Sequence, residues 1–548
     1  MLISKWVPWA RSARQLTAPV RVRGGLVRGS VAMDGTHLRF LGIPYATVTP
    51  ENRFQAPGPE PSWDGVYDAL DGKVICPQCP VLPTGSLPGR PTGQEDCLKI
   101  NVFTPVVPPA EKLPVMVFIH GGGFIEGSGM PLVYGPNYLV PKGVILVTFN
   151  YRLNVPGYLN LGIKEAPGNA GMKDQVAALR WVQKNISSFG GDQDNITIFG
   201  ESAGGVSVSY HLLSPMSRGL FQKAITQSGS SLCPWAIQSN PEYNAHLVAK
   251  TFGCDTKDPY ELLNFFNKKP LKELLMTIKL PNDERKLLFS NLLYAPSVER
   301  EFENVEPFLT EDPYLLLSNG EYTKVPMIIG TTDEEGYFFI GAEKHLSSKI
   351  IGEIEHSLPN NLKFPTEAEE QQIAKEIREM YMGDEAISNK KSSTRKLSKF
   401  YGDPFMTYPS LAETELILKS TDRPIYNYCF KYSGWRNIGK VFGGLHFLSQ
   451  PGATHTDELF YLFHQPFLTW LAKFDKNMID KMTTLWTNFA KYGDPTPSTS
   501  ELVPQRWLPT NPADPQSFVL DREHATVPLW FKDSLKYWRD LYSKYRKT

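Results

Sequence analysis

The stretch FGESAGGVS, residues 199–207, places Ser202 between two glycines in the pattern G-x-S-x-G. The strand-like segment NITIF precedes it and a helix-length segment follows, so we expect Ser202 on a sharp strand-to-helix turn. Such a turn lifts the hydroxyl above a sheet, where the helix N-terminus favours developing negative charge. The pattern predicts nucleophilic acyl transfer by Ser202, provided that other residues activate its hydroxyl.

A second glycine-rich segment, HGGGF at residues 120–124, follows the apolar run VMVFI. Because glycine has no Cβ, a ligand oxygen can approach its backbone N–H closely. We predict that the N–H groups of Gly122, Gly123 and Ala203 form an oxyanion hole. A flexible turn is the alternative interpretation, and the downstream GESAG in the required chain order argues against it.

A serine nucleophile needs a base and an acid that orients the base, in the chain order serine, acid, histidine. Two histidines, His446 and His455, follow the strand-like segment IYNYCF. The small residues around His455 suit a tight loop, so we assign the base to His455 and a structural role to His446. The acid should follow the strand-like PMIIG, within GTTDEEG, where three carboxylates remain open: Asp333, Glu334 and Glu335.

The elements that must position these residues alternate along the chain. Nearly continuous apolar runs predict strands buried on both faces near 115–119 and 144–149, and further strands are expected near 195–199, 223–226, 326–329 and 425–430. The segment 168–186 repeats apolar residues with helical spacing. This alternation predicts an α/β fold with a large, mostly parallel sheet flanked by helices, and chemistry at the carboxyl ends of its strands. The segment 258–362 is expected to add helices that cap the active-site gorge.

Composition excludes several classes of function. The net charge is 0 and 41% of residues are hydrophobic, so no overall field draws the chain to nucleic acid. Apolar runs of membrane-spanning length and phosphate-binding or zinc motifs are lacking, and we expect no metal or cofactor. Residues 1–18 are rich in arginine and poor in acids, which predicts a frayed leader or, alternatively, a transit segment. Residues 19–548 are predicted to form a single domain.

Several motifs together resemble the type-B carboxylesterase/cholinesterase family of α/β-hydrolases. They are HGGGF, EDCL (95–98), FNYRL (149–153), GNAGMKDQ, FGGD, FGESAGG and QSGS. The chain looks most similar to insect carboxylesterases, lepidopteran ones above all. The resemblance implies a serine esterase without a cofactor, which takes a small-molecule ester as substrate and organophosphates or carbamates as inhibitors.

The same resemblance implies roles for individual residues. The family's acid is the glutamate before glycine, here Glu335, and its histidine falls on His455. In the family, buried polar residues surround the triad, and Glu201, Ser228 and Glu458 match them. Trp235 matches the wall of the family's acyl pocket. Structural pairs are implied as well: Arg53 with Glu95, Arg152 with Asp174, and a disulfide between Cys76 and Cys97.

Departures from the family narrow the substrate and the compartment. No aromatic residue lies between Cys76 and Cys97, where cholinesterases hold a quaternary ammonium group, so a choline ester is not expected. The chain has GESAG where juvenile hormone esterases typically show GQSAG. Cys254 lacks a downstream partner for the family's second loop disulfide. We expect a neutral, lipophilic ester and a cytoplasmic location, with mitochondrial or secreted as alternatives.

Two rival functions remain beside ester hydrolysis in detoxification or in hormone or odorant turnover. One is a non-catalytic adhesion or binding homologue, although such relatives usually replace the serine or histidine and carry a membrane span. The other is a sequestering esterase that acylates quickly and turns over slowly. The sequence excludes neither this second rival nor any oligomeric state.

Overall fold

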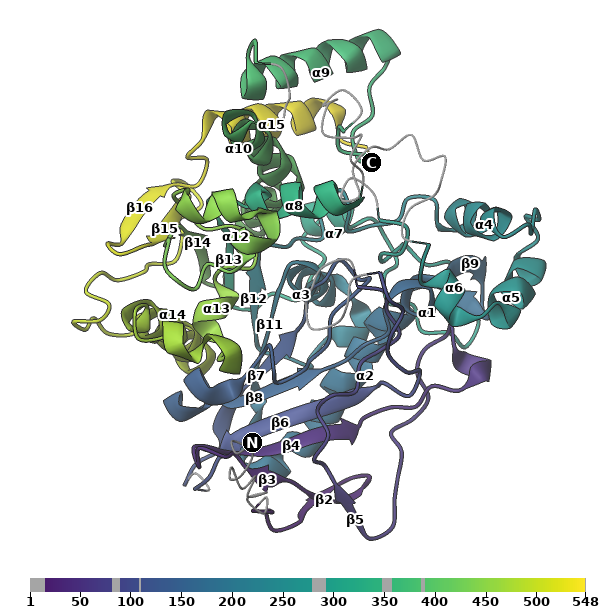
Figure 1. Cartoon of the computed structure of the whole chain (residues 1–548), viewed down its shortest axis with the longest axis vertical. Coiled ribbons are helices and arrows are strands. Elements are labelled where there is room, and N and C mark those ends of the chain that lie inside the picture. Colours follow the sequence, from purple (N-terminus) through teal and green to yellow (C-terminus); the bar gives the residue numbers. More distant parts are fainter. Residues whose placement is uncertain are drawn as a thin grey trace, which may run out of the picture.

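The computed structural model describes residues 15–80, 89–107, 110–277, 292–346, 357–385 and 390–547. Its frame is a twisted 11-stranded sheet that runs through the molecule (Figure 1). In spatial order the strands are β16 (Ala525–Pro528), β15 (Gln516–Leu520), β14 (Ile425–Phe430), β13 (Met327–Thr332), β12 (Lys223–Gln227), β11 (Gly191–Glu201), β7 (Leu113–Ile119), β8 (Ile145–Phe149), β6 (Lys99–Pro105), β4 (His37–Pro44) and β3 (Ser30–Val31).

The central strands are parallel and the edges are antiparallel. β8, β7, β11, β12, β13, β14 and β15 pair in parallel, with Ile198 opposite Val117 and Ala224 in register. β16 pairs antiparallel at one edge, and β3, β4 and β6 do so at the other. All six strands expected from the sequence are present, and the predicted α/β class is confirmed.

Both faces of the sheet are buried, which explains the continuous apolar runs. In β7, Val115 and Val117 belong to one core, whereas Met116 and Phe118 belong to the other. The first core includes side chains of α2 (Ala170–Asn185), α3 (Ala203–Leu213), α11 (Tyr408–Leu418) and α15 (Asp533–Tyr545). The second is closed by α13 (Leu459–Leu462) and α14 (Lys476–Tyr492). The expected helix over 168–186 is α2.

The remaining elements surround this frame. The helices are α1 (Asn154–Tyr158), α4 (Pro241–Thr251), α5 (Pro259–Lys268), α6 (Leu271–Leu274), α7 (Pro313–Ser318), α8 (Gly336–Leu346), α9 (Glu367–Met382), α10 (Lys391–Gly402) and α12 (Gly439–Gly443). A π-helical turn, Asp403–Thr407, joins α10 to α11. The remaining strands are β1 (Val20–Val22), β2 (Gly25–Arg28), β5 (Val66–Asp68), β9 (Asn160–Ile163) and β10 (Ala166–Pro167). Short 3-10 turns cover Pro50–Asn52, Pro136–Tyr138, Val140–Lys142, Ile186–Phe189, Pro215–Ser217, Leu445–Ser449 and Pro466–Leu471.

Two groups of helices lie at different places around the sheet. In Figure 1, α8, α10, α15 and α9 gather at the top, and α4, α5 and α6 lie at the right. The segment 258–362 does contain helices, α5 to α8, but it also contains the core strand β13. Its residues 278–291 and 347–356 lie outside the described residues.

The predicted leader lies mostly outside the described part of the chain, which begins at residue 15. From there, Thr17 N–H donates to the Gly29 carbonyl at 3.0 Å, and Leu16 bridges Ser30. These contacts tie the chain to the residues that follow the first hairpin, β1–β2. Among the described residues, we find no helix that is both long and apolar enough to cross a membrane.

Candidate active site

Ser202 lies between β11 and α3 in a strained backbone conformation, with φ 59° and ψ −127°. Its N–H donates to the Gln227 carbonyl on β12 at 2.9 Å, which anchors the turn. A Cβ at Gly204 would lie 2.0 Å from the Ile119 carbonyl oxygen, and one at Gly200 would lie 2.5 Å from the backbone of Gly204. The turn therefore admits only glycine at both positions, as the G-x-S-x-G pattern predicts. The serine keeps 9% of its surface exposed.

His455 and Glu335 form a buried pair beyond the ends of β14 and β13. Nδ1 of His455 lies 2.7 Å from Oε2 of Glu335. The other oxygen, Oε1, accepts from Ser228 Oγ at 2.6 Å and from Thr332 N–H at 2.7 Å. The Glu335 carboxyl group thus has three hydrogen-bond partners that hold it in place: Ser228 Oγ, Thr332 N–H and His455 Nδ1. Its contact with Nδ1 favours the tautomer in which Nε2 accepts a proton.

The structure thereby separates the three carboxylates that residue reasoning left open. Asp333 contacts the backbone of the histidine's loop, because its Oδ1 accepts from Ala453 N–H at 2.7 Å. Asp457 holds the same loop from the other side and accepts from Thr454 N–H at 2.8 Å. Burial raises the pKa of both carboxyl groups, each to about 7. Glu334 contributes its backbone N–H to the Ala453 carbonyl, so Glu335 is the carboxylate on the imidazole.

Two further acids, Glu201 and Glu458, lie in the same buried region. Oε1 of Glu201 is 3.2 Å from Nε2 of His455, and Oε1 of Glu458 accepts from Gln227 Nε2 at 3.3 Å. Burial, and then the neighbouring carboxylates, raise the pKa of Glu201 well above its ordinary value and that of Glu458 to about 8. At neutral pH the region can therefore hold protons as well as charge.

The glycine loop after β7 lies directly against the serine turn. A Cβ at Gly121 would lie 2.6 Å from the Glu201 carbonyl oxygen and 3.0 Å from the Ser202 Cβ. Gly122, Gly123 and Phe124 all have positive φ, at 108°, 59° and 61°. The Gly122 carbonyl accepts from the N–H groups of residues 125 and 126, at 3.1 and 3.0 Å, which closes the loop on itself. The structure thus packs Gly121 on the serine turn, and Gly122 and Gly123 follow it directly in the chain.

His120, which opens this loop, is a structural residue. It is fully buried, its ring stacks on Tyr151 at 4.3 Å, and Nδ1 lies 2.9 Å from the Gly121 carbonyl. Burial lowers its pKa to about 4, so it is neutral near pH 7. Tyr151 donates to the His120 carbonyl at 2.8 Å and fixes the other side of the loop.

Aromatic side chains surround the candidate residues. The rings of Phe338 and Phe339, both on α8, lie 5.4 and 4.9 Å from the ring of His455. Trp235 is buried, donates from Nε1 to the Phe405 carbonyl at 3.0 Å, and packs 6.4 Å from the ring of Phe124. Trp235 therefore packs near Phe124, at the end of the glycine loop.

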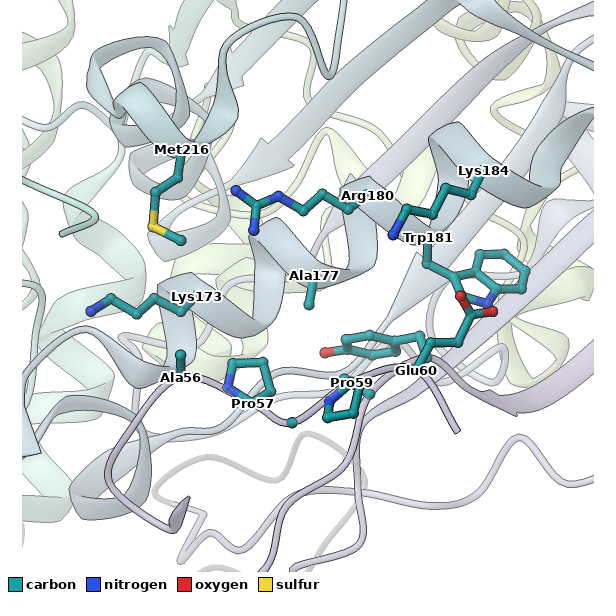
Figure 2. A pocket seen from close by; sticks show the side chains of 13 residues that line it. Ala56, Pro57, Pro59, Glu60, Lys173, Ala177, Arg180, Trp181, Lys184 and Met216 are labelled. Atoms are coloured by element: carbon teal, nitrogen blue, oxygen red, sulfur yellow. The ribbon is translucent and has the colours of Figure 1, made fainter. Parts of the chain in front are cut away.

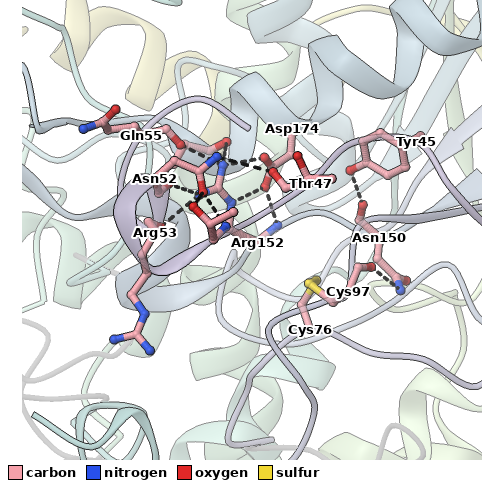
Figure 3. A network of polar contacts seen from close by, with 12 residues as sticks. Tyr45, Thr47, Asn52, Arg53, Gln55, Cys76, Cys97, Asn150, Arg152 and Asp174 are labelled. Atoms are coloured by element: carbon pink, nitrogen blue, oxygen red, sulfur yellow. Dashed lines mark hydrogen bonds and ion pairs between the residues drawn. A yellow bond between two sulfur atoms is a disulfide. The ribbon is translucent and has the colours of Figure 1, made fainter. Parts of the chain in front are cut away.

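The buried Arg152 joins Asp174 to the backbone of the segment 52–55 (Figure 3). Arg152 pairs with Asp174 at 2.6 Å and donates to the carbonyls of Arg53 and Gln55 at 2.9 and 2.8 Å. Two residues later, Asn154 donates from its backbone to Phe124 and from its side chain to the residue 125 carbonyl at 2.7 Å. The pair expected between Arg152 and Asp174 is confirmed, and it positions the glycine loop through Asn154.

The other expected pairs are present as well. Arg53 bridges Glu95 with Nε–Oε2 and Nη2–Oε1 distances of 2.8 and 2.5 Å. Cys76 and Cys97 form a disulfide that closes a 21-residue separation (Figure 3). Four cysteines are free in the described residues: Cys79, Cys233, Cys254 and Cys429.

A cavity of about 210 Å³ lies away from these residues, between the loop 45–60 and α2 (Figure 2). Its charged lining comes from Glu60, Lys173, Arg180 and Lys184. None of the candidate catalytic residues lines it. Among the described residues, we also find no cluster of three His, Cys, Asp or Glu side chains placed to hold a metal ion.

Sequence reasoning missed several residues that complete the site. Gln227 bonds both the serine turn and Glu458, and it lies in the QSGS motif that the sequence already marks. Tyr151 lies in the motif FNYRL, so its presence was visible but not its stacking on His120. The contacts of Phe338, Phe339 and Asp333 have no local signal, because their partners lie more than a hundred residues further along the chain.

Comparisons with known proteins agree with this geometry. Residues 17–538 match the Carboxylesterase family. Esterase FE4 of Myzus persicae is 35% identical over 91% of this chain and 88% of that protein. Juvenile hormone esterase of Tribolium castaneum is 35% identical over 87% of this chain and 84% of that protein.

A solved structure covers nearly the whole chain. The crystal structure of juvenile hormone esterase from Manduca sexta, with OTFP covalently attached, superposes with a TM-score of 0.82 at 30% identity. The match covers 96% of this chain and 99% of that chain. The predicted α/β-hydrolase fold and the similarity to insect esterases are both confirmed. The chain belongs to the carboxylesterase family and is a carboxylic ester hydrolase.

Proposed function

We propose that the protein hydrolyses neutral, lipophilic carboxylic esters through an acyl-enzyme on Ser202. The observation that carries the proposal is the buried contact of 2.7 Å between His455 Nδ1 and Glu335 Oε2. Nε2 of the same ring lies 3.2 Å from Glu201, the residue before Ser202, whose φ is 59°. A carboxylate on Nδ1 leaves Nε2 free to take the serine proton, the arrangement that a serine nucleophile requires. Residues 19–548 would act as one domain.

The reaction follows from these positions in two half-reactions. Ser202 Oγ attacks the ester carbonyl carbon as its proton passes to His455 Nε2, and the carbonyl oxygen becomes an oxyanion. The tetrahedral intermediate collapses, the C–O bond breaks, and the alcohol leaves with the proton from Nε2. Water then attacks the acyl-enzyme, gives a proton to Nε2, and the acid leaves as Ser202 regains its proton. Glu335 keeps its charge throughout and stabilises the imidazolium.

The oxyanion would bind the N–H groups of Gly122, Gly123 and Ala203. The two glycines have positive φ in a loop packed on Ser202, and Ala203 opens α3, where the helix dipole is positive. Loss of one such donor costs about 3 kcal/mol of transition-state stabilisation in comparable sites. Glu201, 3.2 Å from His455 Nε2, can become ionised when the imidazole is charged, which would stabilise the same step.

The substrate class is inferred from the walls of the site. Phe338 and Phe339 are buried aromatic side chains beside His455, and Phe124 of the glycine loop packs near the buried Trp235. They offer apolar surface, which favours an acyl or alcohol chain without charge. Detoxification of xenobiotic esters, or turnover of a hormone or odorant ester, fits such a site. Organophosphates and carbamates would acylate Ser202 and serve as inhibitors.

The decisive experiment labels the protein with a fluorophosphonate and maps the adduct. We expect modification of Ser202, and Ser202→Ala should remove both labelling and hydrolysis of p-nitrophenyl butyrate. The control is Ser209→Ala on the same helix, which should retain labelling. Native protein with intact fold and no label would refute the proposal. Stoichiometric release of alcohol followed by very slow turnover would instead identify a sequestering esterase.

The compartment is a separate part of the proposal. The sequence favoured the cytoplasm over mitochondria or secretion. The Cys76–Cys97 disulfide supports the secreted alternative, because such bonds persist mainly in oxidising compartments. Thiol labelling of protein from its native source, with and without reduction, distinguishes the two: an oxidised pair supports secretion and a reduced pair supports the cytoplasm.

A further inference from the structure

An aromatic surface lies far along the chain from the glycine loop, and three of its four rings come from the segment between α13 and α14. Phe467, Trp470 and Phe474 are 55%, 65% and 50% exposed. Their spacing of three and four residues places them along one side of the 3-10 turn Pro466–Leu471 and the residues that follow. Trp435, 65% exposed, packs on Phe474 with ring centroids 5.3 Å apart. We call these four residues the aromatic surface.

The backbone under this surface is fixed rather than loose. Arg436 is fully buried and donates to the Phe460 and Leu468 carbonyls at 2.7 and 2.8 Å, and to Gln465 Oε1 at 2.6 Å. Leu468 and Leu471 point into the protein. The four aromatic side chains are therefore presented outward on a tethered scaffold. Among the described tryptophans, Trp435 and Trp470 have the most exposed side chains.

In the segment that carries three of the four rings, the exposed charged side chains are positive. Across the described residues 464–477, the exposed charged side chains are Lys473 and Lys476. The one acid of this segment, Asp475, is 1% exposed and accepts from Tyr432 and from the Arg436 backbone. Nζ of Lys473 lies 4.9 Å from the ring of Phe474, and Lys476 also pairs with Asp480 further along α14.

We propose that the aromatic surface docks the protein on an anionic phospholipid bilayer. Tryptophan and phenylalanine beside lysine are the residues that anchor proteins at a membrane interface, where rings enter the headgroup layer and amines meet phosphate. Exposed aromatic groups on a rigid scaffold are unfavourable in water unless a partner covers them. Because Asp475 is buried, its carboxylate is not presented to an anionic surface that would repel it. The inference is independent of the catalytic proposal.

The test is co-sedimentation of the full chain with unilamellar vesicles of phosphatidylcholine, alone or with about 30 mol % phosphatidylserine. We expect binding to the anionic vesicles that weakens with salt. The double variant Phe467→Ser/Trp470→Ser should bind these vesicles at least about tenfold more weakly. The matched control, Tyr243→Ser/Tyr260→Ser, changes two exposed tyrosines on α4 and α5, which lie on the opposite side of Figure 1 from α14, and should bind as the native protein does.

A second variant separates the lipid surface from other partners. Lys473→Gln/Lys476→Gln should remove the preference for phosphatidylserine and leave thermal unfolding and hydrolysis of a water-soluble ester unchanged. Native protein that stays in the supernatant, or serine variants that bind as well as the native protein, would overturn the proposal. So would a native dimer that dissociates in Phe467→Ser/Trp470→Ser without any vesicle binding, because the surface would then join two copies of this chain.

Discussion

Replacement of Glu335 by glutamine changes one oxygen to an amide nitrogen and tests the triad acid directly. Oε1 must still accept from Ser228 and from Thr332 N–H, at 2.6 and 2.7 Å. The amide oxygen will therefore occupy that position, and the NH₂ group will face Nδ1 of His455, now 2.7 Å from Oε2. Two donors cannot share this contact, so the imidazole must move its proton to Nε2.

With the proton on Nε2, the imidazole cannot accept from Ser202. An amide in this position costs about 10⁴-fold in kcat in comparable triads, or about 5.5 kcal/mol. We expect the same scale for Glu335→Gln, because the side chain keeps its shape and both of its other partners. The assay is kcat and KM for p-nitrophenyl butyrate, with KM changed by less than about threefold because substrate contacts are retained. Circular dichroism and urea unfolding report whether the fold is intact.

Asp333→Asn is the matched control. The carbonyl oxygen of the new side chain can still accept from Ala453 N–H, which is 2.7 Å from Oδ1. The residue does not contact the imidazole, so the tautomer of His455 does not depend on it. We expect less than about tenfold loss in kcat, since the loop keeps its hydrogen bond. If Glu335→Gln kept near-native turnover while Asp333→Asn abolished it, the tautomer argument would be refuted and the acid reassigned.

Three further changes test the surrounding scaffold. Burial raises the pKa of Glu413 from 4.5 to about 7. The folded state therefore binds this proton more tightly than the unfolded state does. The free energy of unfolding should fall by about 3 kcal/mol as the pH rises from 4.5 to 7. Urea unfolding at pH 5 and pH 8 measures the free energy of unfolding, and in Glu413→Gln this part of its decline with pH should be absent. An unchanged pH dependence would contradict the assignment. Glu299 is fully buried and its carboxylate lies 2.6 Å from Nζ of Lys173. Lys173→Met leaves this carboxylate without its cation and should lower the free energy of unfolding by about 3–5 kcal/mol, a loss that Glu299→Gln in the same chain should partly recover. A loss below about 1 kcal/mol would show that water replaces the lysine. Asn154 has φ 55° and donates to the glycine loop, so Asn154→Ala should destabilise by about 2 kcal/mol and lower kcat, whereas Asn154→Gly should lose less stability; equal effects would rule out a backbone contribution.

The sequence predicts the centre of the fold because local patterns there are strong. Strands buried on both faces read as unbroken apolar runs, and the serine turn needs glycines whose positions are fixed by backbone contacts. Helix α11 lacks such a pattern, because it is buried on nearly every side and carries Glu413 within its core. The edge strand β16, whose residues are mostly exposed, likewise has no apolar run that would predict it.

The proposed triad acid shows the same limit within the site. Asp333, Glu334 and Glu335 are adjacent, and no local property of the chain distinguishes them. The choice is made by Ser228 and His455, which lie 107 and 120 residues away. Resemblance to a family supplied this choice before the structure did, because a family pattern already contains the outcome of those distant contacts.

The crowding at the serine turn also bears on how this enzyme can be engineered. A methyl group at Gly200, Gly204 or Gly205 would lie 2.0–2.7 Å from backbone atoms of neighbouring strands or of the turn, so random libraries at these positions should return few folded clones. Phe338 and Phe339 carry their rings beside His455 from a helix outside the sheet. Diversity aimed at that helix can alter which esters fit while the sheet and the nucleophile stay in place, which makes α8 the productive target for changing specificity.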